Sequence, residues 1–279
     1  MIVKICGLMS MVDAIYANMA GPDWAGLVFH QGSRRCVSKE TAASVRDMLG
    51  SGIRTVAVTV DRDVGFIRDL VSEGIVDMVQ VHANADESYF RRVADLGVPT
   101  IRAYVVRSAE DVEKASSCEA DYTMLDAGLG SGRTFDWSLL QDADFPYILS
   151  GGLDPHNVLD AVRRLDPAGV DVSSGVETDG AKDPTKMTAF VYAARGNFEP
   201  LLDHHRSQKH GHVDRDVRDP VFHDQILAVD DVNIAVQKFK NYVYDEFQKF
   251  KNYVYDEFHY PEAFSGKVRR LGFSQCSVL

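Results

Sequence analysis

The chain has 279 residues, of which 45% are hydrophobic and 25% charged, as in an ordinary soluble globular protein of one large domain or two small ones. Its formal net charge of −11 disfavours nucleic acid or an anionic membrane as a general partner, because phosphates are bound mainly through clustered Lys and Arg. The sequence has neither a run of about 18 apolar residues nor a basic segment leading into an apolar one at its start. We therefore expect no membrane span, no signal peptide and a cytoplasmic location.

Apolar runs of strand length alternate with segments of helical spacing over the first 195 residues. The expected strands are Val3–Cys6, Ala25–Phe29, Arg54–Val60, Met78–His82, Thr100–Val106, Tyr122–Ala127, Pro146–Gly151 and Val170–Ser174. The expected helices are Val12–Met19, Lys39–Leu49, Val64–Ser72, Glu87–Leu96, Ala109–Ser116, Trp137–Gln141, His156–Leu165 and Pro184–Arg195.

Eight strand-then-helix units predict an α/β fold, a (β/α)8 TIM barrel covering residues 1–198. The strands are continuous Val, Ile and Ala runs, as a parallel sheet covered by helices requires. A doubly wound open sheet is the competing architecture. It is disfavoured because the first strand-to-helix turn lacks a GxGxxG fingerprint and because there are eight units.

Polar residues stand at the C-terminal ends of several predicted strands, where chemistry occurs in this fold. Cys6 ends the first strand and Asp126 ends the sixth, so they form a candidate proton-transfer pair: a thiolate to take a proton and a carboxylic acid to give one. A thiol with its free pKa of about 8.5 is a poor base at neutral pH, so the site would have to lower it. The competing interpretation of Cys6 is a packed core cysteine.

Two glycine-containing turns follow the seventh and eighth strands, Gly151-Gly152 and Ser174-Gly175. Without side chains there, backbone N–H groups can approach an anion, and this is the usual phosphate position in the fold. Either turn alone is better explained by a tight turn that needs positive φ. Because both occur at neighbouring strand ends, we predict a phosphate site.

Two further side chains at the strand ends are candidate substrate contacts. Arg35 offers a forked donor suited to a carboxylate, although a solvated surface arginine explains it equally well. His82 by itself favours a packed core histidine. The four cysteines, at positions 6, 36, 118 and 276, lack CxxC spacing, which argues against a disulfide framework and a zinc site, so we expect no bound metal.

An ordered set of motifs at these strand ends resembles phosphoribosylanthranilate isomerase from Met1 to about Arg195. The motifs are Lys4-Ile5-Cys6-Gly7, Ser33-Arg34-Arg35, Gln80-Val81-His82, Leu125-Asp126, Gly130-Ser131-Gly132, Ser150-Gly151-Gly152 and Asp171-Val172-Ser173-Ser174-Gly175-Val176-Glu177. The resemblance implies an enzyme of tryptophan biosynthesis that needs no cofactor or metal. It also implies the reaction, an Amadori rearrangement of N-(5-phosphoribosyl)anthranilate to 1-(2-carboxyphenylamino)-1-deoxyribulose 5-phosphate.

The resemblance also implies roles for individual residues. Asp126 matches the general acid that protonates the ribose ring oxygen, and Cys6 matches the general base that removes the C2 proton. Arg35 matches the arginine that holds the anthranilate carboxylate, and the glycine turns match the phosphate cradle. Gln80 and His82 are expected among the substrate-binding residues.

The chain departs from the family pattern at Arg34, Thr59, Ala83 and Leu129, of which Arg34 stands where a proline is usual. A changed or broadened sugar-phosphate substrate is therefore an alternative. Another is the related isomerase of histidine biosynthesis, which uses a carboxylate where Cys6 stands. A third is a non-catalytic phosphate-binding barrel that acts through its tail.

Residues 199–279 form a C-terminal extension of different composition. It contains a tandem duplication, because Gln237–Phe247 and Gln248–Phe258 are identical. An eleven-residue period equals three helical turns, so residues 232–258 predict an amphipathic helix that could dock on the barrel or pair with a second copy in a homo-oligomer. The alternative is an extension without selected structure, produced by sequence slippage. His204, His205, His210 and His212 are assigned to a solvated linker rather than a metal site.

Overall fold

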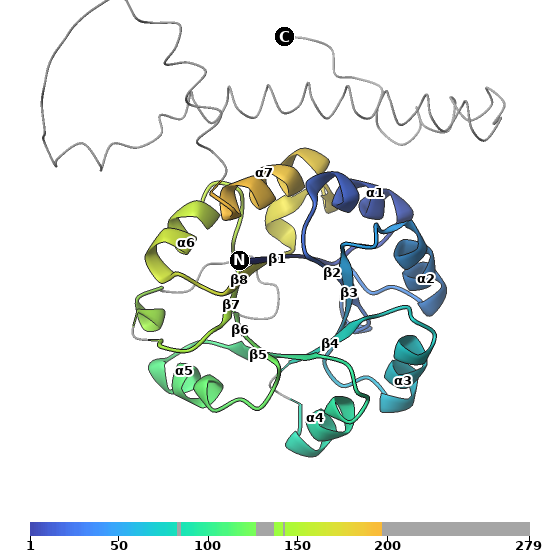
Figure 1. The fold of residues 1–279 in the computed structure, drawn as a ribbon, viewed down its shortest axis with the longest axis horizontal. Coiled ribbons are helices and arrows are strands. Elements are labelled where there is room, and N and C mark those ends of the chain that lie inside the picture. The colour runs from blue at the N-terminus through green and yellow to red at the C-terminus, as the bar shows by residue number, and fades with distance from the viewer. Residues whose placement is uncertain (83–84, 127–136, 142, 197–279) are drawn as a thin grey trace, which may run out of the picture. The chain divides into compact units, whose positions relative to one another are not determined.

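The computed structural model describes residues 1–82, 85–126, 137–141 and 143–196, and within them the chain forms a closed barrel of eight parallel strands (Figure 1). Each strand pairs with the next in the sequence, and β8 closes the ring on β1. Among the described residues, seven α-helices surround the barrel. The tandem repeat and the remainder of the C-terminal extension lie outside the described residues.

The strands of the barrel are β1 (Ile2–Cys6), β2 (Trp24–Val28), β3 (Arg54–Thr59), β4 (Met78–His82), β5 (Thr100–Val105), β6 (Tyr122–Asp126), β7 (Ile148–Ser150) and β8 (Gly169–Val172). The helices are α1 (Met11–Ala20), α2 (Lys39–Met48), α3 (Val64–Ser72), α4 (Glu87–Ala94), α5 (Ala109–Ser116), α6 (Val158–Leu165) and α7 (Pro184–Ala194). The predicted barrel is thus confirmed, with strand and helix ends one or two residues from those expected.

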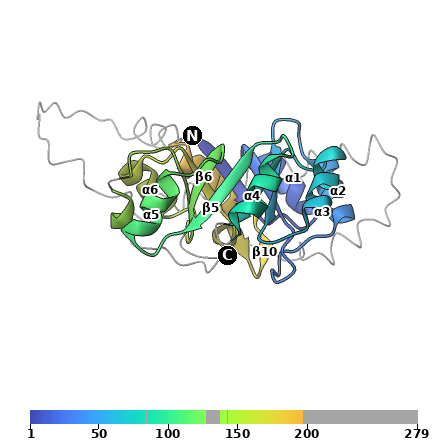
Figure 2. The same cartoon turned by 90° about the horizontal axis from the view of Figure 1, so that it is seen from below.

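Two local elements differ from the expectation. The segment after β6 forms a 3-10 helix, η1 (Trp137–Leu140), instead of an α-helix. A short antiparallel hairpin of β9 (Glu177–Thr178) and β10 (Ala181–Lys182) stands between β8 and α7. Its turn is Asp179-Gly180, with φ of 53° and 82°, the dipeptide that favours a two-residue turn with positive φ. In the side view, β10 lies at the opposite end of the barrel from the N-terminus (Figure 2).

Side chains alternate between the inside of the barrel and the layer beneath the helices. On β1, Val3 and Ile5 belong to the large core between strands and helices, whereas Ile2 and Cys6 belong to the cluster inside the ring. The inner cluster includes the apolar residues Val56, Met78, Ile101, Met124 and Ile148. Strands buried on both faces explain the continuous apolar runs in the sequence. Lys4 is the exception on β1, because it is fully buried on the inner side.

The N-terminal end of the barrel is fastened by aspartates. Asp23, Asp77 and Asp121 each stand just before an even-numbered strand and accept the backbone N–H of the preceding strand, at 2.7 to 2.8 Å. Inside the same end, Trp24 and Tyr122 meet edge to face with ring centroids 4.9 Å apart. The bottom of the barrel is therefore filled and hydrogen-bonded, which leaves the C-terminal end for a site.

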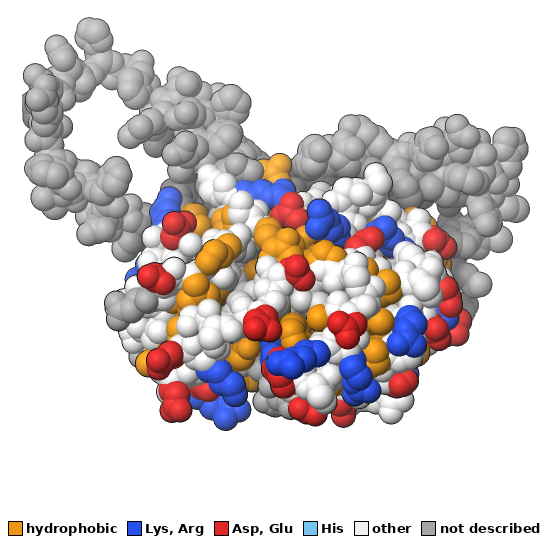
Figure 3. All heavy atoms as spheres, turned by 60° about the horizontal axis from the view of Figure 1, so that its bottom comes forward, with side chains coloured by type: hydrophobic (Ala, Val, Ile, Leu, Met, Phe, Trp, Pro, Cys, Tyr) orange, Lys and Arg blue, Asp and Glu red, His pale blue; other side chains and the backbone are white. Residues whose placement is uncertain are grey.

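Helix starts are fixed by side-chain caps that the sequence encodes locally. Ser10, Ser38, Asp63, Asp86 and Asp183 accept backbone N–H groups of the first turns of α1, α2, α3, α4 and α7. No helix among the described residues is long and apolar enough to cross a membrane. On the face drawn in Figure 3, Lys and Arg side chains are interspersed with Asp and Glu side chains.

Candidate active site

A cavity of about 470 Å³ lies at the C-terminal ends of the strands. Eight of the nine predicted site residues line it: Cys6, Arg35, Gln80, His82, Asp126, Gly151, Gly152 and Ser174. The ninth, Gly175, follows Ser174 directly in the chain. The strand ends therefore bring together residues that are up to 169 positions apart in the sequence (6 to 175).

Cys6 is the last residue of β1 and is buried at the floor of this cavity. Gly26 on β2 leaves room for the thiol, since a Cβ there would lie 2.8 Å from its sulfur. Ser173 donates its hydroxyl to the Cys6 carbonyl at 3.1 Å, which ties the end of β1 to the end of β8. Burial raises the pKa of the Cys6 thiol, and the ammonium of Lys4 opposes this rise.

Asp126 is the last residue of β6, on the other side of the ring from Cys6. It is buried, lines the cavity and stands in register with Ser150 at the end of β7. The cavity thus lies between a thiol and a carboxyl group. A substrate seated in it would have one of these groups on each side, as a division between a base and an acid requires.

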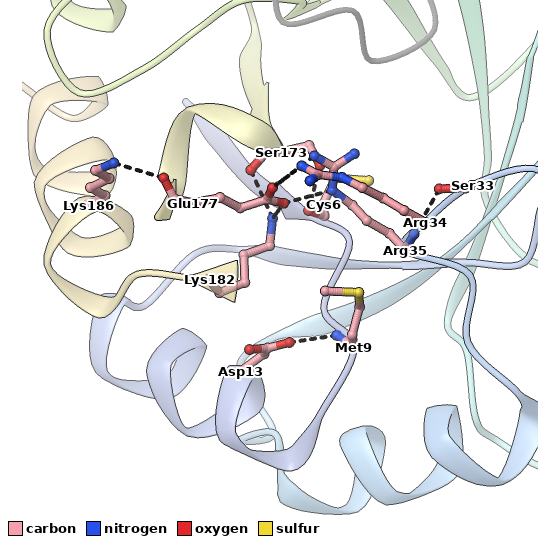
Figure 4. A network of polar contacts seen from close by, with 10 residues as sticks. All are labelled: Cys6, Met9, Asp13, Ser33, Arg34, Arg35, Ser173, Glu177, Lys182 and Lys186. Atoms are coloured by element: carbon pink, nitrogen blue, oxygen red, sulfur yellow. Dashed lines mark hydrogen bonds and ion pairs between the residues drawn. The ribbon is translucent and has the colours of Figure 1, made fainter. Parts of the chain in front are cut away.

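A cluster of charged side chains lies close to Cys6 (Figure 4). Arg35 donates through Nε and Nη2 to the two carboxylate oxygens of Glu177, at 2.7 and 3.0 Å. Lys182 of the hairpin donates to Glu177 Oε1 at 3.0 Å and to the Ser173 carbonyl at 2.9 Å. Burial by itself raises the pKa of Glu177, but Arg35 and Lys182 hold it below its ordinary value. Glu177 is therefore a carboxylate that fixes two cations.

Arg34 adds a second guanidinium to the same carboxylate. Its Nη2 lies 2.6 Å from Glu177 Oε2, and its side chain is 61% exposed at the rim. The single negative charge of Glu177 is paired with three positive charges, those of Arg34, Arg35 and Lys182. This part of a protein with a net charge of −11 is therefore locally positive and attracts anions.

Gln80 and His82 project from β4 into the cavity. Gln80 Oε1 and His82 Nδ1 are buried and have no hydrogen-bond partner among the described residues. Burial and the nearby Lys4 charge lower the pKa of His82, so its imidazole is neutral at pH 7. Buried polar atoms without partners are uncommon and often await a ligand.

The two glycine turns lie side by side above β7 and β8. Gly151 and Gly152 have φ of 97° and 65°, conformations that favour glycine. A Cβ on Gly175 would lie 1.9 Å from the Leu153 carbonyl oxygen, so the two turns touch through backbone atoms. Their backbone is thus exposed to the cavity without covering side chains. No group of three or more His, Cys, Asp or Glu suited to a metal ion occurs among the described residues.

Comparison with known proteins agrees with this geometry. The family model described as N-(5'phosphoribosyl)anthranilate (PRA) isomerase matches residues 3–193. The chain belongs to this isomerase family. A relative of that name from Lactiplantibacillus plantarum is 40% identical over 205 residues, which are 72% of this chain and 96% of the relative. A relative from a Caulobacter species is 42% identical over 69% of this chain and 97% of its own length.

Solved structures of the phosphoribosylanthranilate isomerase family share the barrel. The enzyme from Thermotoga maritima is 35% identical, with a TM-score of 0.64 over 70% of this chain and all of that one. Another structure, with a TM-score of 0.62 and 35% identity, is a complex with reduced 1-(o-carboxyphenylamino)-1-deoxyribulose 5-phosphate and has the same coverage. The family model ends at residue 193, before the C-terminal extension.

Four charged residues of the site are absent from the sequence-based list: Lys4, Asp171, Glu177 and Lys182. Lys4 carries a signal, because a lysine two residues before Cys6 in an apolar strand points to the same side as the thiol. Glu177 and Lys182 flank the Asp179-Gly180 turn, and an Asp-Gly dipeptide is a hairpin signal. Asp171 carries the same kind of signal as Lys4, because it is a charged residue in an apolar strand.

Proposed function

We propose that this member of the family catalyses the isomerisation of N-(5-phosphoribosyl)anthranilate to 1-(2-carboxyphenylamino)-1-deoxyribulose 5-phosphate, a step of tryptophan biosynthesis. The observation that carries the proposal is the single cavity lined by a thiol, a carboxyl group, a guanidinium and two bare glycine turns. The substrate has the matching parts: a ring oxygen that takes a proton, a C2–H group that gives one, a carboxylate and a phosphate.

Asp126 and Cys6 divide the proton transfers in this proposal. Asp126 gives a proton to the ribose ring oxygen, so the ring opens and the nitrogen forms a Schiff base with C1. Cys6 as the thiolate then takes the proton from C2, and the electrons of that bond form a C1–C2 double bond. The resulting enolamine becomes the ketone when C1 gains a proton and the C2 hydroxyl loses one. Positions on opposite sides of the cavity support this division of roles.

Anion contacts hold the two ends of the substrate. A guanidinium has five N–H donors, and Glu177 accepts two of those on Arg35, so donors remain for the anthranilate carboxylate. The turns at Gly151-Gly152 and Ser174-Gly175 receive the phosphate through backbone N–H groups. Gln80 and His82 supply buried polar atoms that the hydroxyl groups of the sugar would satisfy.

We assign this activity to residues 1–198 and treat residues 199–279 as an appendage. Relatives that match 72% of this chain over 96% of their own length support the division. The cytoplasmic location and a homo-oligomer formed through residues 232–258 stay predictions from the sequence. A structure described as monomers generated from the dimeric isomerase of Thermotoga maritima gives a precedent for a dimer in the family.

The test of the activity is turnover by the purified full chain. Loss of anthranilate-type fluorescence from N-(5-phosphoribosyl)anthranilate is expected, together with formation of the ribulose product by mass spectrometry. The two-phosphate substrate of the histidine-pathway isomerase serves as the comparison, and we expect slower turnover with it. A folded full chain that leaves the first substrate unchanged would refute the proposal.

A further inference from the structure

Lys4 occupies an unusual place inside the barrel. It stands two residues before Cys6 on β1, so both side chains point to the inside of the barrel. Lys4 lies one layer below the thiol. Its exposed fraction is 0%. The other members of the inner cluster beside it are mostly apolar. A buried ammonium is costly unless it is paired, so its presence needs an explanation.

Asp171 on β8 is the ion-pair partner of Lys4. The two residues stand in register across the seam that closes the barrel, and Lys4 Nζ lies 2.7 Å from Asp171 Oδ1. Asp171 Oδ2 accepts the Ser150 hydroxyl at 3.1 Å. Buried ion pairs of this kind add little net stability compared with apolar residues of similar volume. A gain in stability therefore does not explain why this ion pair is buried here. Its position beneath Cys6 points to a role in the chemistry of the thiol.

Titratable groups from several elements of the fold line the cavity with Cys6 or act on its charge. They are Lys4 on β1, Arg35 after β2, His82 on β4, Asp126 on β6, Asp171 on β8 and Lys182 on β10. Burial is the strongest influence on the pKa of Cys6 and raises it. Lys4 lowers this pKa by its charge and a hydrogen bond to the sulfur. Asp171 raises the pKa and Lys182 lowers it. Lys182 is already bonded to Glu177 and the Ser173 carbonyl. Lys4 is thus the strongest single influence that favours the thiolate.

The charge on Lys4 is itself secured. Burial by itself lowers the pKa of Lys4, but Asp171 and the Cys6 sulfur hold it above the ordinary value of 10.5. Lys4 is therefore an ammonium at neutral pH. Asp171 has two opposed effects: it keeps Lys4 charged, and its own negative charge repels the thiolate.

We propose that Lys4, held in place by Asp171, is the positioning residue whose ammonium stabilises the Cys6 thiolate that removes the C2 proton. The proposal rests on the isomerase function above only for the identity of that proton. In the step, the sulfur lone pair takes the proton and the C2–H electrons form the second bond of a C1–C2 double bond. The electrons of the C1–N double bond then move to the positive nitrogen. Lys4 gives up no proton in this step.

The test measures the ionisation of Cys6 in the full chain without using turnover. The rate at which iodoacetamide alkylates Cys6 is followed against pH by mass spectrometry of the Cys6 peptide. In Lys4→Met we expect the midpoint to rise by about one pH unit or more, which is a tenfold loss of thiolate below the midpoint. In Asp171→Asn we expect a smaller change than in Lys4→Met, because the substitution removes both a charge that repels the thiolate and the partner that holds Lys4 in place.

A matched control is Lys39→Met, which removes an ammonium paired with Glu73 on the outside of the barrel and should leave the midpoint unchanged. An unchanged midpoint in folded Lys4→Met would overturn the proposal. If Lys4→Met does not fold, the double variant Lys4→Met/Asp171→Leu, which replaces both buried charges by apolar side chains, decides: a higher midpoint supports the proposal and an unchanged or lower one overturns it. Because alkylation is independent of turnover, an inert wild type with shifted midpoints would refute only the proposed function.

Discussion

At the N-terminal end of the barrel, Asp77 and Asp121 accept backbone N–H groups of the neighbouring strand, whereas at the C-terminal end Gln80 and His82 carry buried polar atoms without partners among the described residues. The first arrangement satisfies each group within the protein. The second leaves hydrogen-bonding capacity directed into a cavity. The two ends of one sheet thus separate stability from binding, as expected for this fold.

The contrast extends to charge. At the N-terminal end, each aspartate acts on a backbone group about 20 residues before it in the chain, as Asp121 does on Thr100. At the C-terminal end, Glu177 joins Arg34 and Arg35, which precede it by 143 and 142 residues. Substitutions at the first end should therefore change stability, and substitutions at the second should change catalysis. The following predictions test that separation.

Gly175→Ala should have the largest effect of these variants. Because its Cβ would lie 1.9 Å from the Leu153 carbonyl oxygen, the two phosphate-binding turns must move apart. A displacement near 1 Å at a binding group can lower kcat/KM by about a hundredfold. Steady-state kinetics would measure this, with Gly52→Ala as the control, since no atom lies within 4 Å of a Cβ there. Unchanged kinetics in Gly175→Ala would argue against the phosphate cradle.

Glu177→Gln should raise KM by roughly tenfold, since a hydrogen bond to a charged group contributes about 1.5–3 kcal/mol and Arg35 loses such a partner. The value of kcat should change less, because Cys6 and Asp126 stay in place. Glu73→Gln, at the surface pair with Lys39, is the matched control and should leave KM unaltered. A loss confined to kcat would contradict the assignment of Arg35 to binding.

The same carboxylate predicts a dependence of stability on pH. Its folded pKa lies below the ordinary 4.5, so its contribution to the free energy of unfolding is fully present above that value. The contribution is lost as the pH falls below 4.5 and through the lowered folded pKa of Glu177. Urea titrations between pH 3 and 7 should therefore show a shallower acid decline in Glu177→Gln than in the wild type. Parallel curves would contradict the prediction.

Asp121→Ala should affect stability and leave catalysis unchanged. The substitution removes the acceptor of both the backbone N–H and the hydroxyl of buried Thr100, at 2.7 and 3.0 Å. An unsatisfied buried donor costs about 1–3 kcal/mol of the free energy of unfolding. Asp160→Ala, which breaks an exposed pair with Arg164, should cost much less. A fall in kcat without loss of stability would remove the distinction between the two ends.

Removal of residues 199–279 should have the smallest effect on catalysis. Since relatives cover almost their whole length on the barrel alone, kcat/KM should stay within about twofold of the full chain. Sedimentation of both proteins would show whether the extension promotes self-association. A large loss of kcat/KM would contradict the assignment of the activity to residues 1–198.

The sequence was sufficient to predict the barrel and the gathering of the candidate residues at one end of it. Eight apolar runs mark strands buried on both faces, and local caps such as Ser10 and Asp183 mark helix starts. Because parallel strands end at one rim, Cys6 and Asp126 could be assigned to a common cavity before any geometry was known.

The supporting contacts could not be predicted in the same way. The pair of Lys4 and Asp171 depends on how the last strand registers with the first, across 167 residues, and no local pattern encodes that register. The attachment of Arg35 to Glu177 depends on a hairpin of two-residue strands, which is shorter than the periodicity that reveals a strand. The η1 segment, with four residues, is likewise too short for a helical period to be decisive.

The most direct test of the account is the isomerase assay on the full chain beside Cys6→Ala and Asp126→Asn, with the fold of each checked by circular dichroism. We predict turnover of N-(5-phosphoribosyl)anthranilate by the wild type and a loss of kcat on the order of 10²–10⁴-fold in each variant, the contribution of general acid or base catalysis. Full activity in both folded variants would contradict the account.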